Sequence, residues 1–223
     1  MADEAAAQAA PGTRRRTQMP LPDRRQRLVE AAARVMKRDG VAAATTRAIT
    51  AEAGMPHGAF HYCFGTKQEL YREVFTADMD AAFTAATTTL ATGTDVGESL
   101  RRALSAYWEQ TSGDRQAQVV LTELSVLSLR DPELEGLRRW HVHAYHTRLT
   151  EALDRLAATT DRGWTLATDL LAWIVLSSLT GITESWLADG ERSRPREQLD
   201  ILCEQLAGYS APRGVPGTSR SAS

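Results

Sequence analysis

Polar, basic and aromatic side chains that could contact nucleic acid gather in one short stretch of the sequence. Residues 46–54 and 55–64 have the dimensions of two short helices, with Gly54 in the tight turn between them. At about 100° per residue, a second helix that buries Phe60 and Phe64 directs its other side chains outward. That outward face is His57, Gly58, Ala59, His61 and Tyr62. It is small, polar and aromatic, which suits a DNA major groove. Short amphipathic helix pairs also occur in all-α proteins that never touch DNA, so this alternative stays open on the helix pair alone.

The distribution of charge favours the nucleic-acid interpretation. The 223 residues contain 26 Lys+Arg and 28 Asp+Glu, a net charge of −2 that argues against a bulk polycation such as a histone-like protein. Residues 1–72 nevertheless hold 12 Lys+Arg against 7 Asp+Glu, whereas residues 73–223 hold 14 against 21. A basic segment on an acidic body would orient the chain on phosphate.

Three histidines between Trp140 and His146 invite comparison with a metal site. On a helix, His141 and His143 diverge by about 200°, and only His143 and His146 share a face. Two imidazoles without a carboxylate on the same face make a poor zinc site. We therefore expect no metal, and favour a partly buried polar network or a ligand contact.

Enzyme signatures are missing from the sequence. It has no G-x-S-x-G elbow, Walker loop, H-E-x-x-H or Glu-x-x-His pair. Cys63 would lie on the predicted DNA-binding helix, which argues against a nucleophilic role. Together Cys63 and Cys203 support neither a disulfide framework nor a zinc knuckle, and a reducing cytosol suits them. We expect a protein that is not an enzyme and needs no cofactor.

All five tryptophans follow residue 107, a distribution that suits a C-terminal domain built around an aromatic-lined cavity. For any single tryptophan, ordinary core packing is the alternative. The residues expected to line the cavity are Tyr107, Trp108, Leu124, Trp140, His143 and Trp173. Such a lining predicts an aromatic or otherwise lipophilic ligand, with charge a minor feature.

The elements that must position these side chains all follow a helical pattern. Apolar residues recur at helical spacing, and Val and Ile rarely alternate with polar residues, so we expect no strand. The pattern predicts an all-α protein of nine helices, at about 22–39, 46–53, 56–63, 66–83, 96–111, 115–129, 131–158, 164–188 and 195–208.

The helix predicted at 164–188 is apolar on most sides. Its most apolar run, residues 170–182, falls short of the about 20 residues that span a bilayer, so we expect a buried helix and no membrane contact. Its own chain can cover one face. The other face, with the stripe on helix 195–208, would pair with the same surface of a second subunit.

The stretch from Arg24 to Phe75 resembles the DNA-binding domain of the TetR (tetracycline repressor) family. The resemblance spans about fifty residues with correct spacing, through Thr45-Thr46-Arg47, Ala51-Glu-Ala-Gly54, Gly58-Ala-Phe60 and Phe64-Gly-Thr-Lys-Gln-Glu-Leu70. The later helices resemble the regulatory domain more loosely, through Glu184-Ser-Trp-Leu-Ala-Asp-Gly190. The resemblance implies a homodimeric bacterial repressor, cytoplasmic and nucleoid-associated when bound, that leaves a palindromic operator when a small molecule enters the C-terminal pocket.

Several DNA contacts follow from the resemblance. It implies that Thr45 or Thr46 contacts phosphate, that Arg47 reaches a guanine edge, and that Lys67 binds phosphate. The family usually has tyrosine where this chain has His61, with Tyr62 next to it. This departure could shift the phosphate contact by one residue or make it depend on pH, although neutral histidine donates the same bond. A basic arm at Arg14–Arg16 could contact DNA or remain a solvated tail.

The predicted organisation is a disordered arm (1–20), a three-helix DNA-binding domain (21–65), a helical regulatory and dimerisation domain (66–209) and a disordered tail (210–223). The helix from residue 66 would connect the two domains and act as the lever between two dimer shapes. The alternative function is an all-α ligand-binding or scaffold protein without DNA binding. A steep salt dependence of operator affinity would separate the two.

Overall fold

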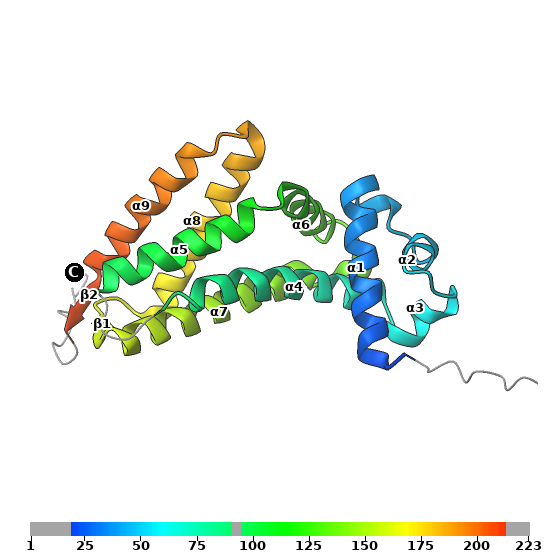
Figure 1. The fold of residues 1–223 in the computed structure, drawn as a ribbon, viewed down its shortest axis with the longest axis horizontal. Helices are drawn as coiled ribbons and strands as arrows, with labels where there is room; N and C mark the ends of the chain where they lie inside the picture. The colour runs from blue at the N-terminus through cyan, green and yellow to red at the C-terminus, as the bar shows by residue number, and fades with distance from the viewer. Residues whose placement is uncertain (1–18, 91–94, 213–223) are drawn as a thin grey trace, which may run out of the picture.

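The computed structural model describes residues 19–90 and 95–212, which form an elongated helical molecule (Figure 1). Its described residues form nine α-helices, so the predicted all-α class is confirmed. The helices are α1 (Leu21–Asp39), α2 (Thr46–Glu52), α3 (Gly58–Cys63), α4 (Lys67–Thr87), α5 (Val96–Ser112), α6 (Arg115–Leu127), α7 (Leu137–Thr159), α8 (Thr168–Asp189) and α9 (Ser193–Gly208). Two 3-10 turns, η1 (Val41–Ala43) and η2 (Pro132–Leu134), and two strands, β1 (Arg162–Trp164) and β2 (Ser210–Pro212), complete the order.

Helix α4 begins with the capping box that its sequence predicts. The Thr66 hydroxyl accepts a hydrogen bond from the Glu69 amide at 3.2 Å, and the Glu69 carboxylate accepts one from the Gly65 amide at 3.1 Å. These bonds satisfy amides that the first turn leaves unpaired. Helix α4 then runs along the middle of the molecule beside α7, from the α1–α3 end toward the two strands (Figure 1).

Two apolar cores meet along α4. The N-terminal core contains α1–α3 and the first two turns of α4 as far as Phe75, and it also includes Leu124 of α6 and Leu137 of α7. The second core starts at Met79 and joins α4 to α5, α7, α8 and α9. The packing boundary therefore falls inside α4. The predicted domain boundary at residue 65 stays a prediction. In the packing, α6 and α7 also contribute to the core beneath the first three helices.

The helix predicted from residue 131 begins later than expected. Asp131 does accept a hydrogen bond from the Glu133 amide at 2.9 Å, but the turn that it caps is the 3-10 turn η2. Gly136 then adopts a left-handed conformation with φ of 78°, and α7 starts at Leu137. This break lets Leu134 and Leu137 both enter the N-terminal core. The prediction of one continuous helix from residue 131 to 158 is therefore wrong at its start.

A short antiparallel strand pair corrects two further expectations. Trp164, predicted to begin a helix, lies in β1 and pairs with Ser210 of β2. The Trp164 indole also donates a hydrogen bond to the Leu153 carbonyl at 3.2 Å. Strands of three residues are too short to show an alternating pattern in the sequence, and their pairing joins residues 46 to 50 positions apart. The predicted tail therefore starts as strand at 210–212, whereas residues 1–18, with Arg14–Arg16, and 213–223 lie outside the described residues.

Helix α8 is longer than its apolar run and less buried than expected. Its 22 residues make it the one described helix that is long and apolar enough, by length and composition only, to cross a membrane. The chain itself buries only 33% of its most apolar 18-residue window. Leu170 and Ile174 are exposed. A single chain thus covers one face of α8 and leaves the other open.

Candidate nucleic-acid interface and effector cavity

Helices α2 and α3 have the helix-turn-helix arrangement that the sequence predicts, at one end of the molecule (Figure 1). Gly54 makes the turn with a positive φ of 62°, a conformation that glycine adopts without a Cβ clash. Phe60 and Phe64 are buried, with ring centroids 5.7 Å apart. This packing turns the opposite side of α3 toward solvent.

The outward side of α3 carries most of the predicted reading face. His57, Gly58, His61 and Tyr62 are exposed, and Ala59 is half-buried. A Cβ added at Gly58 would meet no atom within 4 Å, so nothing within the protein requires glycine there. The open space is available to a partner that approaches α3 closely. The Tyr62 ring, in turn, lies under the Arg24 guanidinium of α1 at 5.5 Å.

The residues assigned through the resemblance occupy the starts of α2 and α4. The Thr45 hydroxyl caps α2 by accepting a hydrogen bond from the Ala48 amide at 3.1 Å, which leaves its proton free to donate elsewhere. Thr46 and Lys67 are half-buried. Arg47 is exposed and has no ion pair within the described ranges. These side chains remain candidates for DNA contact.

Arg25 of α1 holds helix α3 against its neighbours, a role that the sequence analysis did not predict. Its guanidinium donates to the Cys63 carbonyl at the end of α3 and to the Glu73 carboxylate of α4, the latter at 2.6 Å. It also lies 4.3 Å from the centroid of the Phe64 ring. These partners are 38 to 48 residues away, so no local pattern could have identified this three-way contact.

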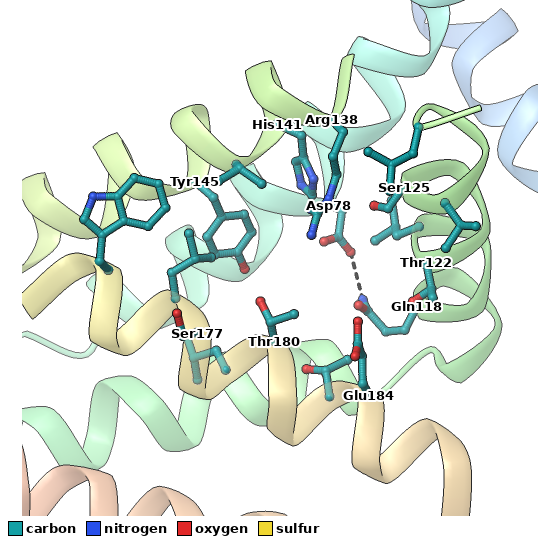
Figure 2. Close-up of a pocket in the computed structure, with 18 of the residues that line it drawn as sticks. Asp78, Gln118, Thr122, Ser125, Arg138, His141, Tyr145, Ser177, Thr180 and Glu184 are labelled. Carbon is teal, nitrogen blue, oxygen red and sulfur yellow. Dashed lines mark hydrogen bonds between the residues drawn. The ribbon is translucent and has the colours of Figure 1, made fainter. Parts of the chain in front are cut away.

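A cavity of about 490 Å³ lies among helices α4 to α8 (Figure 2). Helix α7 contributes Arg138, His141, Val142 and Tyr145, which share one helical face. Of the six predicted lining residues, Tyr107 and Trp173 line this cavity. The structure thus contains a cavity in the predicted domain, with a largely different lining.

The other four predicted residues lie elsewhere. Trp108 packs edge-on against Trp186 at 5.4 Å in the second core. Leu124 faces the N-terminal core, because it lies about 100° around α6 from the cavity residue Ser125. Trp140 lies under the Arg72 guanidinium. His143 is exposed, two residues from His141 and therefore on another side of α7.

The cavity wall carries more charge than the sequence led us to expect. Its ionisable residues include Asp78, Arg138, His141 and Glu184. Burial raises the pKa of Asp78 to about 6, although a hydrogen bond from Gln118 Nε2 at 3.1 Å acts in the opposite direction. One signal could have identified Asp78: a carboxylate four residues after Val74, on the buried stripe of α4.

His141 connects the two cores beside this cavity. Its ring stacks on Phe75 of the N-terminal core at 4.0 Å and meets Tyr145 edge-on at 5.8 Å. Burial and the nearby Arg138 lower the pKa of His141 to about 4, so the ring is neutral at pH 7. The Tyr145 and Tyr107 hydroxyls share a hydrogen bond of 2.6 Å, and burial raises both pKa values.

The other two histidines that invited a metal interpretation contact Trp173 instead. His146 stacks on its ring at 4.3 Å, and His143 meets the ring edge-on at 5.9 Å. His146 Nε2 also lies 3.3 Å from an Asp169 carboxylate oxygen. Within the described ranges, no group of three or more His, Cys, Asp or Glu side chains could hold a metal ion.

Comparisons with known proteins bear on the same regions. The family model described as bacterial regulatory proteins, tetR family, matches residues 28–74, from α1 into α4. The nicotine-responsive transcriptional repressor HdnoR of Paenarthrobacter nicotinovorans is 27% identical over 182 residues, which cover 82% of this chain and 93% of that repressor. Residues 28–74 therefore carry the DNA-binding domain of the TetR family. As predicted, the matches are those of a transcriptional regulator and not of an enzyme.

Solved structures extend the similarity in fold beyond residues 28–74 to the later helices. Salmonella enterica GusR matches 86% of the chain and 98% of its own length, with a TM-score of 0.65 and 18% identity. The multidrug binding protein EbrR, crystallised with imidazole, matches 87% and 97% respectively, with a TM-score of 0.59 and 26% identity. TetR-family regulators are soluble cytoplasmic proteins that bind DNA and small-molecule effectors, typically as dimers.

Proposed function

We propose that this regulator is a repressor that binds a palindromic operator as a homodimer and is released by a small aromatic or lipophilic ligand. The observation that carries this proposal is the cavity of about 490 Å³, because its walls include α4, α6 and α7, which all contribute to the core beneath the DNA-binding helices. The similar repressor HdnoR is nicotine-responsive, and the similar protein EbrR binds multiple drugs, which supports a small organic effector.

DNA recognition in this proposal uses the exposed side of α3 together with the start of α2. Arg47 reads a guanine edge, because its exposed guanidinium has no protein partner among the described residues. His57, Gly58, Ala59, His61 and Tyr62 form the reading face on α3. Thr45, Thr46 and Lys67 contact phosphates and set the orientation of the domain, which brings the regulator onto the nucleoid when it is bound.

Helix α6 offers a direct physical link between ligand and DNA. Its N-cap residue, Asp114, forms an ion pair with Lys37 of α1 at 2.6 Å. Its Glu123 carboxylate accepts a hydrogen bond from the Val41 amide at 3.3 Å, close to α2. On the cavity side, Gln118 bonds Asp78 of α4. A ligand that displaces α6 or α4 would therefore move the DNA-binding helices through contacts already in place.

The homodimer in this proposal forms through α8 and α9. Both helices expose large apolar side chains on a single chain, including Leu170, Ile174 and Ile201. Small residues of α8, such as Ser177 and Gly181, line a shallow groove between α8 and α9 where a partner helix could approach closely. In the binding shape, the two α3 helices lie one DNA turn apart, about 34–36 Å, and a ligand favours another spacing.

Selection of bound sequences from random DNA at defined salt tests the DNA-binding part. We expect an enriched palindrome, and a steep loss of affinity for it between about 50 and 200 mM salt as counterions are released. A pool without any enriched sequence would contradict this proposal. It would favour the alternative, an all-α ligand-binding or scaffold protein that does not bind DNA.

A further inference from the structure

We propose that the effector carries a positive charge beside an aromatic or apolar group, and that the Asp78 carboxylate binds this charge at the wall formed by α4 and α6. The inference rests on the proposed function, since it specifies the ligand of the same cavity. It also changes the sequence-based expectation, in which charge was a minor feature of the ligand.

Asp78 presents an incompletely partnered carboxylate to the cavity. Figure 2 shows it reaching inward from α4, joined by a hydrogen bond to Gln118 of α6. The bond occupies Oδ1, whereas Oδ2 has no hydrogen-bond partner and no ion pair within residues 19–90 and 95–212. The nearby Lys37 is already paired with Asp114. Buried carboxylates are normally paired with a cation, so this arrangement leaves that position to the ligand.

The remaining charges of the wall also favour a cation. Glu184 faces the cavity from α8, opposite α7, and has no ion pair in the described part of the chain. The one guanidinium of the lining, Arg138, acts on His141, which it helps to keep neutral. The lining thus holds two carboxylates, Asp78 and the solvent-exposed Glu184, against one guanidinium. This excess of negative charge favours a cationic ligand over an anionic one.

Aromatic rings surround the same space. Trp173, Tyr145 and the neutral ring of His141 all line the cavity. The faces of such rings attract a cation within about 6 Å, and their apolar area suits a flat or bulky organic group. A carboxylate beside several rings recognises an organic cation better than a small hydrated ion, because the rings cannot replace lost hydration.

Titration of Asp78 adds a measurable signature. Burial holds its pKa near 6, so roughly one carboxyl in ten is ionised at pH 5 and nine in ten at pH 7. A permanently charged ligand should therefore bind up to about tenfold more tightly at pH 7 than at pH 5. The charged or titratable groups around Asp78 are Lys37 of α1, Tyr107 of α5, Asp114 at the start of α6, Arg138, His141 and Tyr145 of α7, and Glu184 of α8.

The test compares phenyltrimethylammonium with tert-butylbenzene, its neutral isostere, by ligand-observed NMR on the full chain. We expect the cation to bind at least about tenfold more tightly, and Asp78→Asn to lower its affinity by at least about tenfold. The same substitution should change the affinity for tert-butylbenzene less than about twofold. Arg138→Gln should strengthen binding of the cation, because it removes a repulsive charge from the lining.

Asp80→Asn is the matched control, because Asp80 lies on the same helix but pairs with Arg148 at 2.5 Å and does not line the cavity. It should leave both affinities unchanged, and thermal melting should show that each variant is folded. Equal binding of the two probes by the unsubstituted chain would overturn the proposal. The proposal would also be overturned if Asp78→Asn lost affinity equally for both probes, or if the unsubstituted chain did not bind the cation at millimolar concentration.

Operator release separates this inference from the proposed function. If the cation binds through Asp78 but leaves operator affinity unchanged, the proposed cation site is supported and the proposal that a ligand in this cavity releases the operator is contradicted. If tert-butylbenzene releases the operator and the cation binds no more tightly than tert-butylbenzene, the proposal of a ligand-released repressor is supported and the proposed cation site is contradicted.

Discussion

At the residue scale, Asp78 makes the stability of the ligand-free protein depend on pH. Burial raises its pKa from 3.8 to about 6, so between these values the native state binds more protons than the unfolded state. The free energy of unfolding therefore falls as the pH rises through this window. The lowered pKa of His141 acts in the opposite direction between about 4 and 6.5.

Asp78→Asn should consequently stabilise the protein at pH 7, by about 1–3 kcal/mol, because it removes the cost of a buried charge. At pH 4 the gain should nearly vanish, since Asp78 is then largely protonated. Urea unfolding at pH 7 and pH 4 measures the difference in free energy of unfolding between the variant and the unsubstituted chain. The contribution of His141 cancels from this difference, because both proteins contain His141. Asp80→Asn should change stability by less than about 0.5 kcal/mol at either pH. A gain for Asp78→Asn that is equal at both pH values would exclude this electrostatic origin.

Arg47 and Lys67 should differ in what their loss does to DNA binding. Arg47→Ala should cost about 1–3 kcal/mol on the selected operator and relax specificity at one base pair. Lys67→Ala should weaken binding to every sequence alike and reduce the salt slope by about 1. Titrations of both variants on operator and scrambled DNA measure these effects. An equal loss for Arg47→Ala on the two DNAs would remove its proposed role as a reader of bases.

At the element scale, α4 depends on the capping box at its first turn. Thr66→Ala removes the acceptor for the Glu69 amide and should lower the free energy of unfolding by about 1 kcal/mol. Thr66→Ser keeps the hydroxyl and should cost much less. Denaturant unfolding compares the two, and a similar loss for both would mean that the methyl group, and not the cap, stabilises this end of α4.

The same helix shows why local pattern and packing boundary differ. The spacing of its apolar residues predicts one long helix, and α4 is one helix. The two cores divide in its middle, between Phe75 and Met79, because α6 and α7 fold back onto the first three helices. The position of the boundary depends on which distant helices pack against each turn of α4. A local sequence pattern contains no information about these contacts.

At the scale of the whole molecule, the open face of α8 and α9 should determine the oligomeric state. Ile201 is 55% exposed on a single chain, and Ile201→Asp would place an uncompensated charge in the proposed interface. We expect sedimentation equilibrium to show a shift from dimer to monomer, together with weaker operator binding. Leu21→Asp is the control for the oligomeric state, because Leu21 is 44% exposed, begins α1 and lies on neither α8 nor α9. A dimer that survives Ile201→Asp unchanged would contradict this interface.

The sequence by itself determined the helical class, the helix-turn-helix and the outward face from His57 to Tyr62, because each depends on spacing within a few turns. It also indicated a C-terminal cavity, but placed Trp108, Leu124, Trp140 and His143 in its lining. Only the tertiary structure decided the actual lining, the start of α7 after Gly136 and the pairing of Trp164 with Ser210. A cavity is bounded by whichever faces remain after five helices have packed, so rotation of one helix by a single residue exchanges one wall residue for another.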